Sequence, residues 1–335
     1  MRTRNIKRGN LDVTVVGYGG GPIGNIFRPI PAAEAQAQIE AAWNAGIRSF
    51  DTAPMYGHGL SEHRLGHALL EHQRRDYVLS TKVGRTLTPA ALGTFDTGVW
   101  VDTPPFRVDF DYTYDAVQRQ VQDSLQRMCQ ERFDILLVHD IDRSTHGDAQ
   151  PERFQEALKG AFPALIKLRE EGLVKAIGVG VNQASVCVDV LEKVDIDVVL
   201  LAGRYTLLEQ EPVNDLLPLC EGRDVSVLLG GVFNSGILAT GPIDGAKFNY
   251  GPASAQIRDR TSRLAEVCLR YDINLPAAAI QFVLAHPVVK QIVLGARTVD
   301  QQDKNLHWMN EIIPAEFWRE CRDLGLIEQN APTPI

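Results

Sequence analysis

Four polar residues follow short apolar segments in the first half of the chain, and their types suit proton transfer. Asp51 follows the apolar part of GIRSFDTAPMYG, and Tyr56 comes five residues later in a glycine-rich stretch. Lys82 lies near the end of VLSTKVG, and His139 ends ILLVH. A tyrosine hydroxyl ordinarily has a pKa of about 10, and a nearby lysine cation favours its deprotonated form. The set therefore predicts a tyrosine with a lowered pKa that exchanges a proton with an alcohol or carbonyl oxygen.

The other three residues have defined parts in this interpretation, although each alone also has an ordinary structural explanation. Asp51 would keep Lys82 charged and oriented, and His139 would hydrogen-bond the reacting oxygen. Taken singly, a strand-end aspartate usually caps a turn, a strand-end lysine usually points to solvent, and one histidine is usually a satisfied core residue. Adjacent strands lie about 4.8 Å apart, so side chains from three neighbouring strand ends can meet in one pocket.

The scaffold for these residues is a regular alternation of strand-like and helix-like segments. Eight such units follow one another between about residue 13 and residue 309, with no low-complexity linker. Strand–helix alternation favours parallel strands with right-handed crossovers, and eight units favour a closed (β/α)8 TIM barrel. Residues 1–335 are therefore predicted to form a single α/β barrel domain, with its chemistry at the carboxyl ends of the strands.

Three segments lie outside this repeat. The N-terminal RTRNIKRGNLDVT predicts a hairpin that turns at Gly9–Asn10 and closes the bottom of the barrel. The segment from about 84 to 113 is too long for an ordinary connection, and with Trp100 it is a candidate substrate loop that acts as a lid. A short tail covers about 326–335.

Composition limits the classes of partner. The net charge of −8 argues against a nucleic-acid partner, because a phosphate backbone favours a basic surface. No run of about 18 apolar residues predicts a membrane span, and the basic start lacks the apolar region of a signal peptide. The dispersed cysteines favour reduced thiols and a cytoplasmic protein; they are Cys129, Cys187, Cys220, Cys268 and Cys321. The oligomeric state stays open.

The motifs resemble those of a known family. FDTAPMYG followed by SE, then STKVG and LLVH, is similar to the aldo-keto reductase superfamily over nearly the whole chain. The resemblance implies an NAD(P)-dependent oxidoreductase in which Asp51, Tyr56, Lys82 and His139 act beside a nicotinamide dinucleotide. VLSTKVGR, LLVHDID and GRYTLLEQ resemble the aldose 1-dehydrogenase subgroup. That resemblance implies oxidation of an aldose, as a cyclic hemiacetal, at C1 to a lactone.

The same resemblance implies a cofactor site and a substrate site. Asn182 would hold the nicotinamide carboxamide, and the segment after the eighth strand would hold the adenosine half, as barrels often bind phosphate there. The residues expected to contact the dinucleotide are Gly21, Asp51, Asn182, Gly230, Gly231, Phe233, Gly295, Ala296, Arg297, Gln301 and Asn305. The residues expected to contact a sugar or aldehyde substrate are Tyr56, Trp100, His139 and Asp140, the last accepting from a second hydroxyl.

Departures from the family pattern bear on the cofactor. Gln301 stands where NADP-preferring members carry a basic residue, which favours NAD, although Arg297 leaves NADP possible through a pair with the 2′-phosphate. Val181 replaces the usual serine before the carboxamide-binding asparagine. Ala202 or Gly203 replaces the amide partner expected on the sixth strand.

Two patterns are expected to mislead. GYGGGPIG contains a formal GxGxxG at Gly19, Gly21 and Gly24, but three prolines delay the helix that a Rossmann turn would begin at once. These glycines are predicted to let backbone pass close to a ligand at the barrel mouth. His63 and His67 are spaced four apart, with His58 upstream, but they do not form HExxH, so they predict a solvated helix face and no metal.

Three alternative functions remain open. The first is an NADPH-dependent reductase of a sugar-derived or other small aldehyde or ketone. The second is a Schiff-base lyase in which Lys82 attacks a carbonyl, although Asp51 would hold that lysine protonated. The third is a binding protein without turnover, which the complete set of four residues disfavours.

Overall fold

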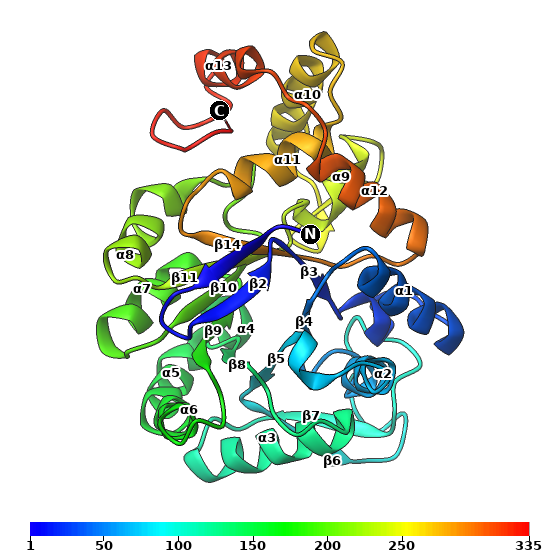
Figure 1. Cartoon of the computed structure of the whole chain (residues 1–335), viewed down its shortest axis with the longest axis vertical. Coiled ribbons are helices and arrows are strands. Elements are labelled where there is room, and N and C mark those ends of the chain that lie inside the picture. Colours follow the sequence, from blue (N-terminus) through cyan, green and yellow to red (C-terminus); the bar gives the residue numbers. More distant parts are fainter. Residues whose placement is uncertain (335) are drawn as a thin grey trace.

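The centre of the molecule is a closed barrel of parallel strands, shown in a computed structural model that describes residues 1–334. Helices surround the strands, which confirms the predicted (β/α)8 barrel (Figure 1). Around the barrel the order is β10-β11-β14-β3-β4-β5-β8-β9. The strands are β3 (Val16–Gly19), β4 (Ser49–Asp51), β5 (Val78–Val83), β8 (Ile135–His139), β9 (Ala176–Val181), β10 (Val198–Ala202), β11 (Ser226–Gly230) and β14 (Val289–Leu294).

Most of the long helices have one buried face and one face in water, whereas α11 is buried at almost every position. In α3 the buried positions recur every three or four residues, as in Val117, Val121, Ser124 and Met128, which is the period of an α-helix. The α-helices are α1 (Ala32–Asn44), α2 (Leu60–Leu69), α3 (Tyr114–Met128), α4 (Arg143–His146), α5 (Gln150–Lys159), α6 (Ala161–Glu170), α7 (Ala184–Lys193), α8 (Leu216–Gly222), α9 (Ile237–Thr240), α10 (Ala255–Arg270), α11 (Leu275–Leu284), α12 (Val299–Met309) and α13 (Ala315–Asp323). Short 3-10 turns are η1 (Pro22–Gly24), η2 (Arg74–Asp76), η3 (Gly147–Ala149), η4 (Glu211–Asn214) and η5 (Asn234–Gly236).

The N-terminal hairpin is present and closes the amino-terminal end of the barrel. Strand β1 (Thr3–Ile6) pairs antiparallel with β2 (Leu11–Thr14), and Figure 1 shows this pair across the strands. Its apolar side chains join the inward side chains of the barrel in one buried cluster: Ile6, Leu11, Val13, Val78, Ile135, Leu137, Ala176, Val198, Leu200, Leu228 and Val293.

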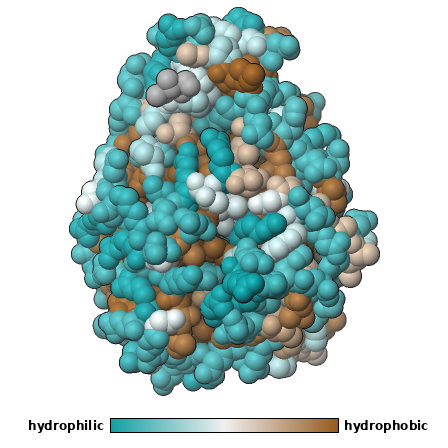
Figure 2. Space-filling model, in the orientation of Figure 1, coloured by the Kyte–Doolittle hydropathy of each residue, from teal (hydrophilic) through white to brown (hydrophobic). Residues whose placement is uncertain are grey.

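The outer surface of the molecule in this view is mainly hydrophilic, with hydrophobic residues in small groups (Figure 2).

The long segment after β5 contains regular structure that was not predicted from the sequence. Strand β6 (Arg85–Pro89) pairs antiparallel with β7 (Phe106–Phe110), so the lid is a hairpin with a long connection. A smaller pair, β12 (Lys247–Phe248) with β13 (Gly251–Pro252), lies in the connection after β11. The β6–β7 hairpin therefore gives the candidate lid an ordered structure beside the barrel.

Two long helical stretches are each interrupted by a break. A side-chain carbon at Gly160 would lie 2.4 Å from the Tyr112 carbonyl oxygen, so the chain between α5 and α6 packs too tightly for any other residue. The second break separates α10 from α11 by a bend of 100°. It contains Asp272 with a positive φ of 54°, and Pro276 follows in the first turn of α11.

Within residues 1–334 no single helix is long and apolar enough to cross a bilayer, and only the bent pair α10–α11 meets that test jointly.

Candidate active site

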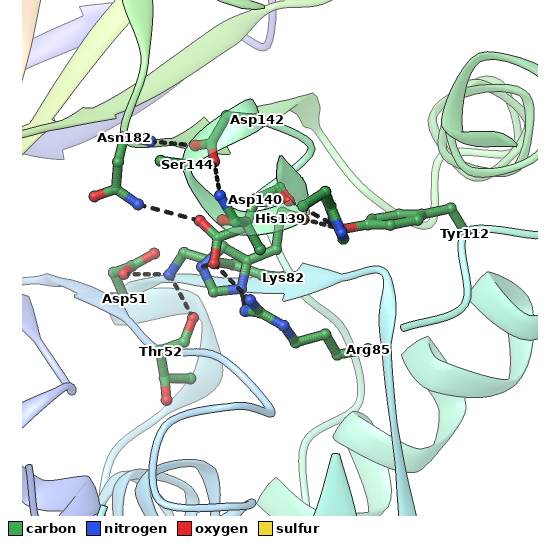
Figure 3. Close-up of polar contacts among 12 residues, drawn as sticks. Asp51, Thr52, Lys82, Arg85, Tyr112, His139, Asp140, Asp142, Ser144 and Asn182 are labelled. Carbon is green, nitrogen blue, oxygen red and sulfur yellow. Dashed lines mark hydrogen bonds and ion pairs between the residues drawn. The ribbon is translucent and has the colours of Figure 1, made fainter. Parts of the chain in front are cut away.

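Strand register brings the predicted polar residues to one end of the barrel. Asp51 ends β4 and pairs with Ser80 of β5, while Lys82 of β5 pairs with Leu137 of β8. His139 ends β8, so three adjacent strands deliver Asp51, Lys82 and His139 to the carboxyl end (Figure 3). This is the end opposite the N-terminal hairpin.

Lys82 is a buried cation that donates two hydrogen bonds. Its Nζ donates to Oδ2 of Asp51 at 2.8 Å and to the Thr52 carbonyl oxygen at 2.8 Å. Ser80 Oγ donates to the other Asp51 oxygen at 2.6 Å. Burial alone would lower the pKa of Lys82, but Asp51 and Tyr56 outweigh it, so the pKa is raised and the amine stays charged. A charged lysine cannot attack a carbonyl, which weighs against the Schiff-base alternative.

The loop that follows β4 presents Tyr56 beside this cation. Lys82 Nζ lies 4.7 Å from the centroid of the Tyr56 ring, and the His139 ring centroid is 6.0 Å from it in an edge-on arrangement. A side-chain carbon at Gly24 would lie 2.7 Å from the Tyr56 carbonyl carbon. Gly24, the last glycine of GYGGGPIG, is therefore needed for contact with the Tyr56 loop, whereas the glycines of this motif were predicted to face a ligand.

The pKa of Tyr56 is the opposite of the sequence expectation. Desolvation by burial raises the pKa of Tyr56 to about 12, and the opposing effect of Lys82 does not compensate. The expectation of a lowered pKa was wrong because it counted the cation and neglected the low-dielectric surroundings. Without a ligand, Tyr56 holds its proton at neutral pH.

His139 is neutral and belongs to a second polar cluster. Burial, Arg85 and Lys82 all lower the pKa of His139 well below its ordinary value. Its Nδ1 is 3.0 Å from a guanidinium nitrogen of Arg85, and the other terminal nitrogen of Arg85 donates to Oδ2 of Asp140 at 2.7 Å. Asn182 Nδ2 donates to Oδ1 of Asp140 at 3.3 Å (Figure 3).

Asp140 is therefore already engaged on both oxygens. It is 7% exposed, and Arg85 and Asn182 are its partners. This placement indicates that Asp140 holds Arg85 and Asn182 in position. The direct contact of Asp140 with a substrate hydroxyl stays a prediction.

The lid hairpin places Trp100 against the candidate catalytic tyrosine. The Trp100 and Tyr56 ring centroids are 5.6 Å apart, and Trp100 is buried. Trp100 also forms a β-bridge with Ile26, and His58 Nδ1 lies 2.6 Å from the Phe106 carbonyl oxygen. These contacts join the lid to the loops after β3 and β4, so Trp100 forms an apolar wall beside Tyr56.

The residues predicted to hold a dinucleotide lie on the same end of the barrel: Gly21 follows β3, Asp51 ends β4, and the others lie at or after the ends of β9, β11 and β14. Gly230 ends β11 and Gly231 follows with a positive φ of 62°. Phe233 is half-buried, with its ring centroid 6.3 Å from that of Trp308. Gly295 is exposed, while Ala296 and Asn305 are buried.

The first turn of α12 is ordered by its own side chains. Thr298 caps α12 by accepting from the Gln301 amide at 3.1 Å, and Gln301 Oε1 accepts from the Arg297 amide at 2.9 Å. Gln301 is exposed and uncharged. Its side chain orders the loop through the hydrogen bond with Arg297 and contributes no cation there.

These surroundings fit a dinucleotide. A side-chain carbon at Gly21 would meet nothing within 4 Å, so the backbone is open to a close ligand. Among residues 1–334 the buried Oδ1 of Asn234 has no hydrogen-bond partner. The exposed Phe27 ring lies 4.8 Å from Lys247 Nζ and 5.7 Å from the Arg297 guanidinium carbon. Open backbone, an unpaired polar atom and two cations beside an aromatic ring suit a phosphate-bearing nucleotide.

The two misleading patterns are also resolved. GYGGGPIG leads into the short η1 and not directly into a long helix, so it does not form a Rossmann turn. His63 and His67 are exposed on α2, while His58 is buried under the lid. No group of three or more His, Cys, Asp or Glu side chains in the described part of the chain is arranged to hold a metal.

Arg85 was not predicted as a site residue from the sequence. It contacts two predicted site residues, His139 and Asp140, although it lies three positions after Lys82 in STKVGR. An arginine at the end of a strand ordinarily points to solvent, so its residue type gave no signal. Only the β6–β7 hairpin, which turns Arg85 back over the barrel end, shows its position.

The family comparison covers most of the chain. A model of the aldo/keto reductase family matches residues 15–325. Pyridoxal 4-dehydrogenase from Microbacterium luteolum is 43% identical, over 97% of both chains. D-threo-aldose 1-dehydrogenase from a Pseudomonas species is 39% identical, over 97% of this chain and 96% of the relative.

A solved structure has the same architecture. The holo form of the aldo-keto reductase AKR11C1 from Bacillus halodurans superimposes with a TM-score of 0.73 at 25% identity, and 99% of each chain is covered.

Proposed function

This chain belongs to the aldo/keto reductase family of oxidoreductases, which use nicotinamide cofactors, and on that premise we propose that it is an aldose 1-dehydrogenase. The proposed reaction oxidises a cyclic hemiacetal at its anomeric carbon and gives a lactone. The observation that carries the proposal is the buried Asp51–Lys82 pair, at 2.8 Å, directly beneath the ring of Tyr56.

Tyr56 is proposed to accept the proton of the anomeric hydroxyl. The phenolate that forms is stabilised by Lys82, whose charge is maintained by Asp51. His139 is proposed to donate a hydrogen bond to the same oxygen, which orients the hydroxyl toward Tyr56. When bound, the nicotinamide supplies the hydride acceptor. Trp100 excludes water from one side of the pocket.

The cofactor is proposed to be NAD. Asn182 donates through Nδ2 to Asp140, which leaves its amide oxygen to accept from the carboxamide. Gly230, Gly231 and Phe233 would lie along the pyrophosphate, and the residues of the α12 loop would hold the adenosine half: Gly295, Ala296, Arg297, Gln301 and Asn305. The neutral Gln301 supports NAD, because a 2′-phosphate is best bound by a cation.

One observation supports a second candidate, the reduction of a small aldehyde or ketone. Because burial raises the pKa of Tyr56 to about 12, its protonated form predominates at neutral pH. That form is the proton donor that carbonyl reduction needs. Oxidation needs the phenolate, so the oxidative rate is expected to rise on the alkaline side.

A substrate panel separates the two candidates. Aldoses, pyridoxal and simple aldehydes would be assayed with NAD, NADP and both reduced cofactors, with product identified by mass spectrometry. Lactone formation from an aldose or from pyridoxal hemiacetal with NAD supports the dehydrogenase. Reduction of simple aldehydes far faster than oxidation of any hemiacetal would replace it with the reductase.

A further inference from the structure

Arg85 contacts the site but lies outside the four residues to which the reaction is assigned. We propose that Arg85 is a positioning residue, which holds His139 as a neutral imidazole with its proton on Nε2 and aligns Asn182 through Asp140. This inference rests on the proposed function, because it assigns the hydrogen-bond donor of that reaction.

The direction of one hydrogen bond determines the tautomer. The Nη1 of Arg85 and the Nδ1 of His139 are 3.0 Å apart. A guanidinium has only donors, so Nδ1 must be the acceptor and cannot carry a proton. In a neutral imidazole the proton then lies on Nε2, which makes Nε2 the nitrogen that can donate to a substrate oxygen.

The position of Arg85 is itself strongly restrained. It is 5% exposed, and it begins β6 in register with Phe110 of β7. Its guanidinium carbon lies 4.8 Å from the centroid of the Phe110 ring. The base of the lid hairpin therefore holds the guanidinium over the barrel end, and little of it is open to a substrate.

Arg85 also controls the carboxylate beside His139. Asp140 Oδ2 accepts from Arg85 at 2.7 Å and lies 3.5 Å from Nε2 of His139, which is too long for a good hydrogen bond. Without Arg85 this buried carboxylate would lose its salt bridge and would favour an imidazolium at His139. Arg85 therefore opposes protonation directly by its charge and indirectly by neutralising Asp140.

The same carboxylate joins His139 to the proposed cofactor-binding amide. Asp140 Oδ1 accepts from Nδ2 of Asn182, and the Asn182 backbone amide donates to Asp142 at 2.9 Å (Figure 3). One guanidinium thus sets the orientation of both the histidine and, through one carboxylate, the asparagine amide.

The electrostatic surroundings agree with this geometry. Burial lowers the pKa of His139 most, and the charges of Arg85 and Lys82 lower it further. The charged and titratable groups around His139 come from five segments: Tyr56 after β4, Lys82 of β5, Arg85 of β6, Tyr112 before α3, and Asp140 after β8.

Nitrogen-15 NMR of histidine-labelled protein reads the tautomer without any turnover. In the wild type the His139 signals, assigned by their loss in His139→Gln, are expected to show one protonated and one unprotonated ring nitrogen. This pattern should persist between about pH 5.5 and 8. In Arg85→Met the signals are expected to titrate within that range or to show a mixture of tautomers.

The matched variants separate positioning from folding. Arg107→Met removes an exposed arginine of the same hairpin, one that pairs with Asp109 at 2.8 Å, and should leave both the NMR pattern and kcat unchanged. Arg85→Lys keeps the positive charge, so it should restore the low pKa of His139. Because one ammonium group lacks the planar fork that donates to both His139 and Asp140, it should restore only part of kcat. If Arg85→Met unfolds, Arg85→Met with Asp140→Asn removes the unpaired carboxylate and serves in its place.

Kinetics supply the second readout, with whichever substrate of the panel turns over. Arg85→Met is expected to lower kcat about 10- to 100-fold with a smaller change in KM, and to add an acid limb to the pH profile. A His139 signal that keeps its Nε2 proton and does not titrate in Arg85→Met, or a kcat within twofold of Arg107→Met, would overturn the proposal. Wild-type protein that turns over no hemiacetal but shows the expected tautomer would overturn the proposed function alone.

Discussion

The two ends of the barrel are made from the same strands and have opposite interiors. At the amino end, Ile6, Leu11 and Val13 of the hairpin pack on apolar side chains of the barrel. At the carboxyl end, Lys82 and Arg85 are nearly as deeply buried, each paired with its own aspartate. An apolar plug is held by non-directional burial, whereas each buried charge at the other end requires a partner at hydrogen-bond distance.

From this difference we expect the amino end of the barrel to contribute mainly to stability and the carboxyl end to contribute the chemistry. Apolar burial tolerates hydrophobic residues of similar volume, so the plug can change without altering reactivity. The polar end has no such tolerance, because removing one partner leaves a buried charge unpaired. Changes at the carboxyl end should therefore affect turnover first, and changes at the amino end should affect unfolding first.

Replacing Tyr56 with phenylalanine tests the carboxyl end most severely. We expect kcat to fall about 10²- to 10⁴-fold, because the general acid–base group is lost, while binding of NAD(H) stays near normal. Steady-state kinetics and fluorescence titration with NADH would measure both. Tyr114→Phe, at an exposed tyrosine of α3, is the matched control. A loss of less than tenfold would remove Tyr56 from the proposed mechanism.

Truncating the plug tests the amino end. Ile6→Ala should lower the free energy of unfolding by about 2–4 kcal/mol, because Ile6 is completely buried in the cluster under the barrel. Denaturant unfolding followed by circular dichroism would measure this, and kcat/KM at 25 °C should stay within twofold. A large loss of activity in folded Ile6→Ala protein would mean that the two ends are not independent.

The pH dependence of oxidation refines the account of the polar end. Tyr56 must begin as the phenolate, and burial raises its pKa to about 12. Below that pKa the phenolate fraction rises tenfold per pH unit, so the oxidative kcat/KM should rise by up to about tenfold per unit on the alkaline side. The reductive rate uses the protonated tyrosine and should not rise. A pH-independent oxidative rate between about pH 6 and 9 contradicts this assignment.

The smallest expected effect concerns the cofactor. NAD should be preferred over NADP in kcat/KM, and Gln301→Arg should shift the ratio toward NADP by about tenfold, because a charge-assisted pair to phosphate contributes about 1.5–3 kcal/mol. Gln301→Glu is the matched control and should disfavour NADP further. A wild-type preference for NADP of tenfold or more would indicate that Arg297 already supplies the cation.

Much of the barrel could be predicted from local patterns. The turn at Gly9–Asn10, the alternation of strands and helices and the strand that ends at His139 agree with the structure within a few residues. The breaks between α5 and α6 and between α10 and α11 were missed, although Gly160 and Pro276 stand at them. The antiparallel pair β6–β7 was missed because its partners are separated by a long connection with no repeating pattern.

By itself the sequence determined the period of the fold and the identity of the reactive side chains. Strand–helix alternation favours a parallel barrel, and in such a barrel Asp51, Lys82 and His139 must reach the same end, because parallel strands share a direction. Only the tertiary structure decided the protonation states. Burial raises the pKa of Tyr56, which the type of its neighbour does not reveal. The hydrogen bond that Arg85 donates to Nδ1 places the proton of His139 on Nε2. This contact forms only because the β6–β7 hairpin brings Arg85 to the end of β8, which lies far from it in the sequence.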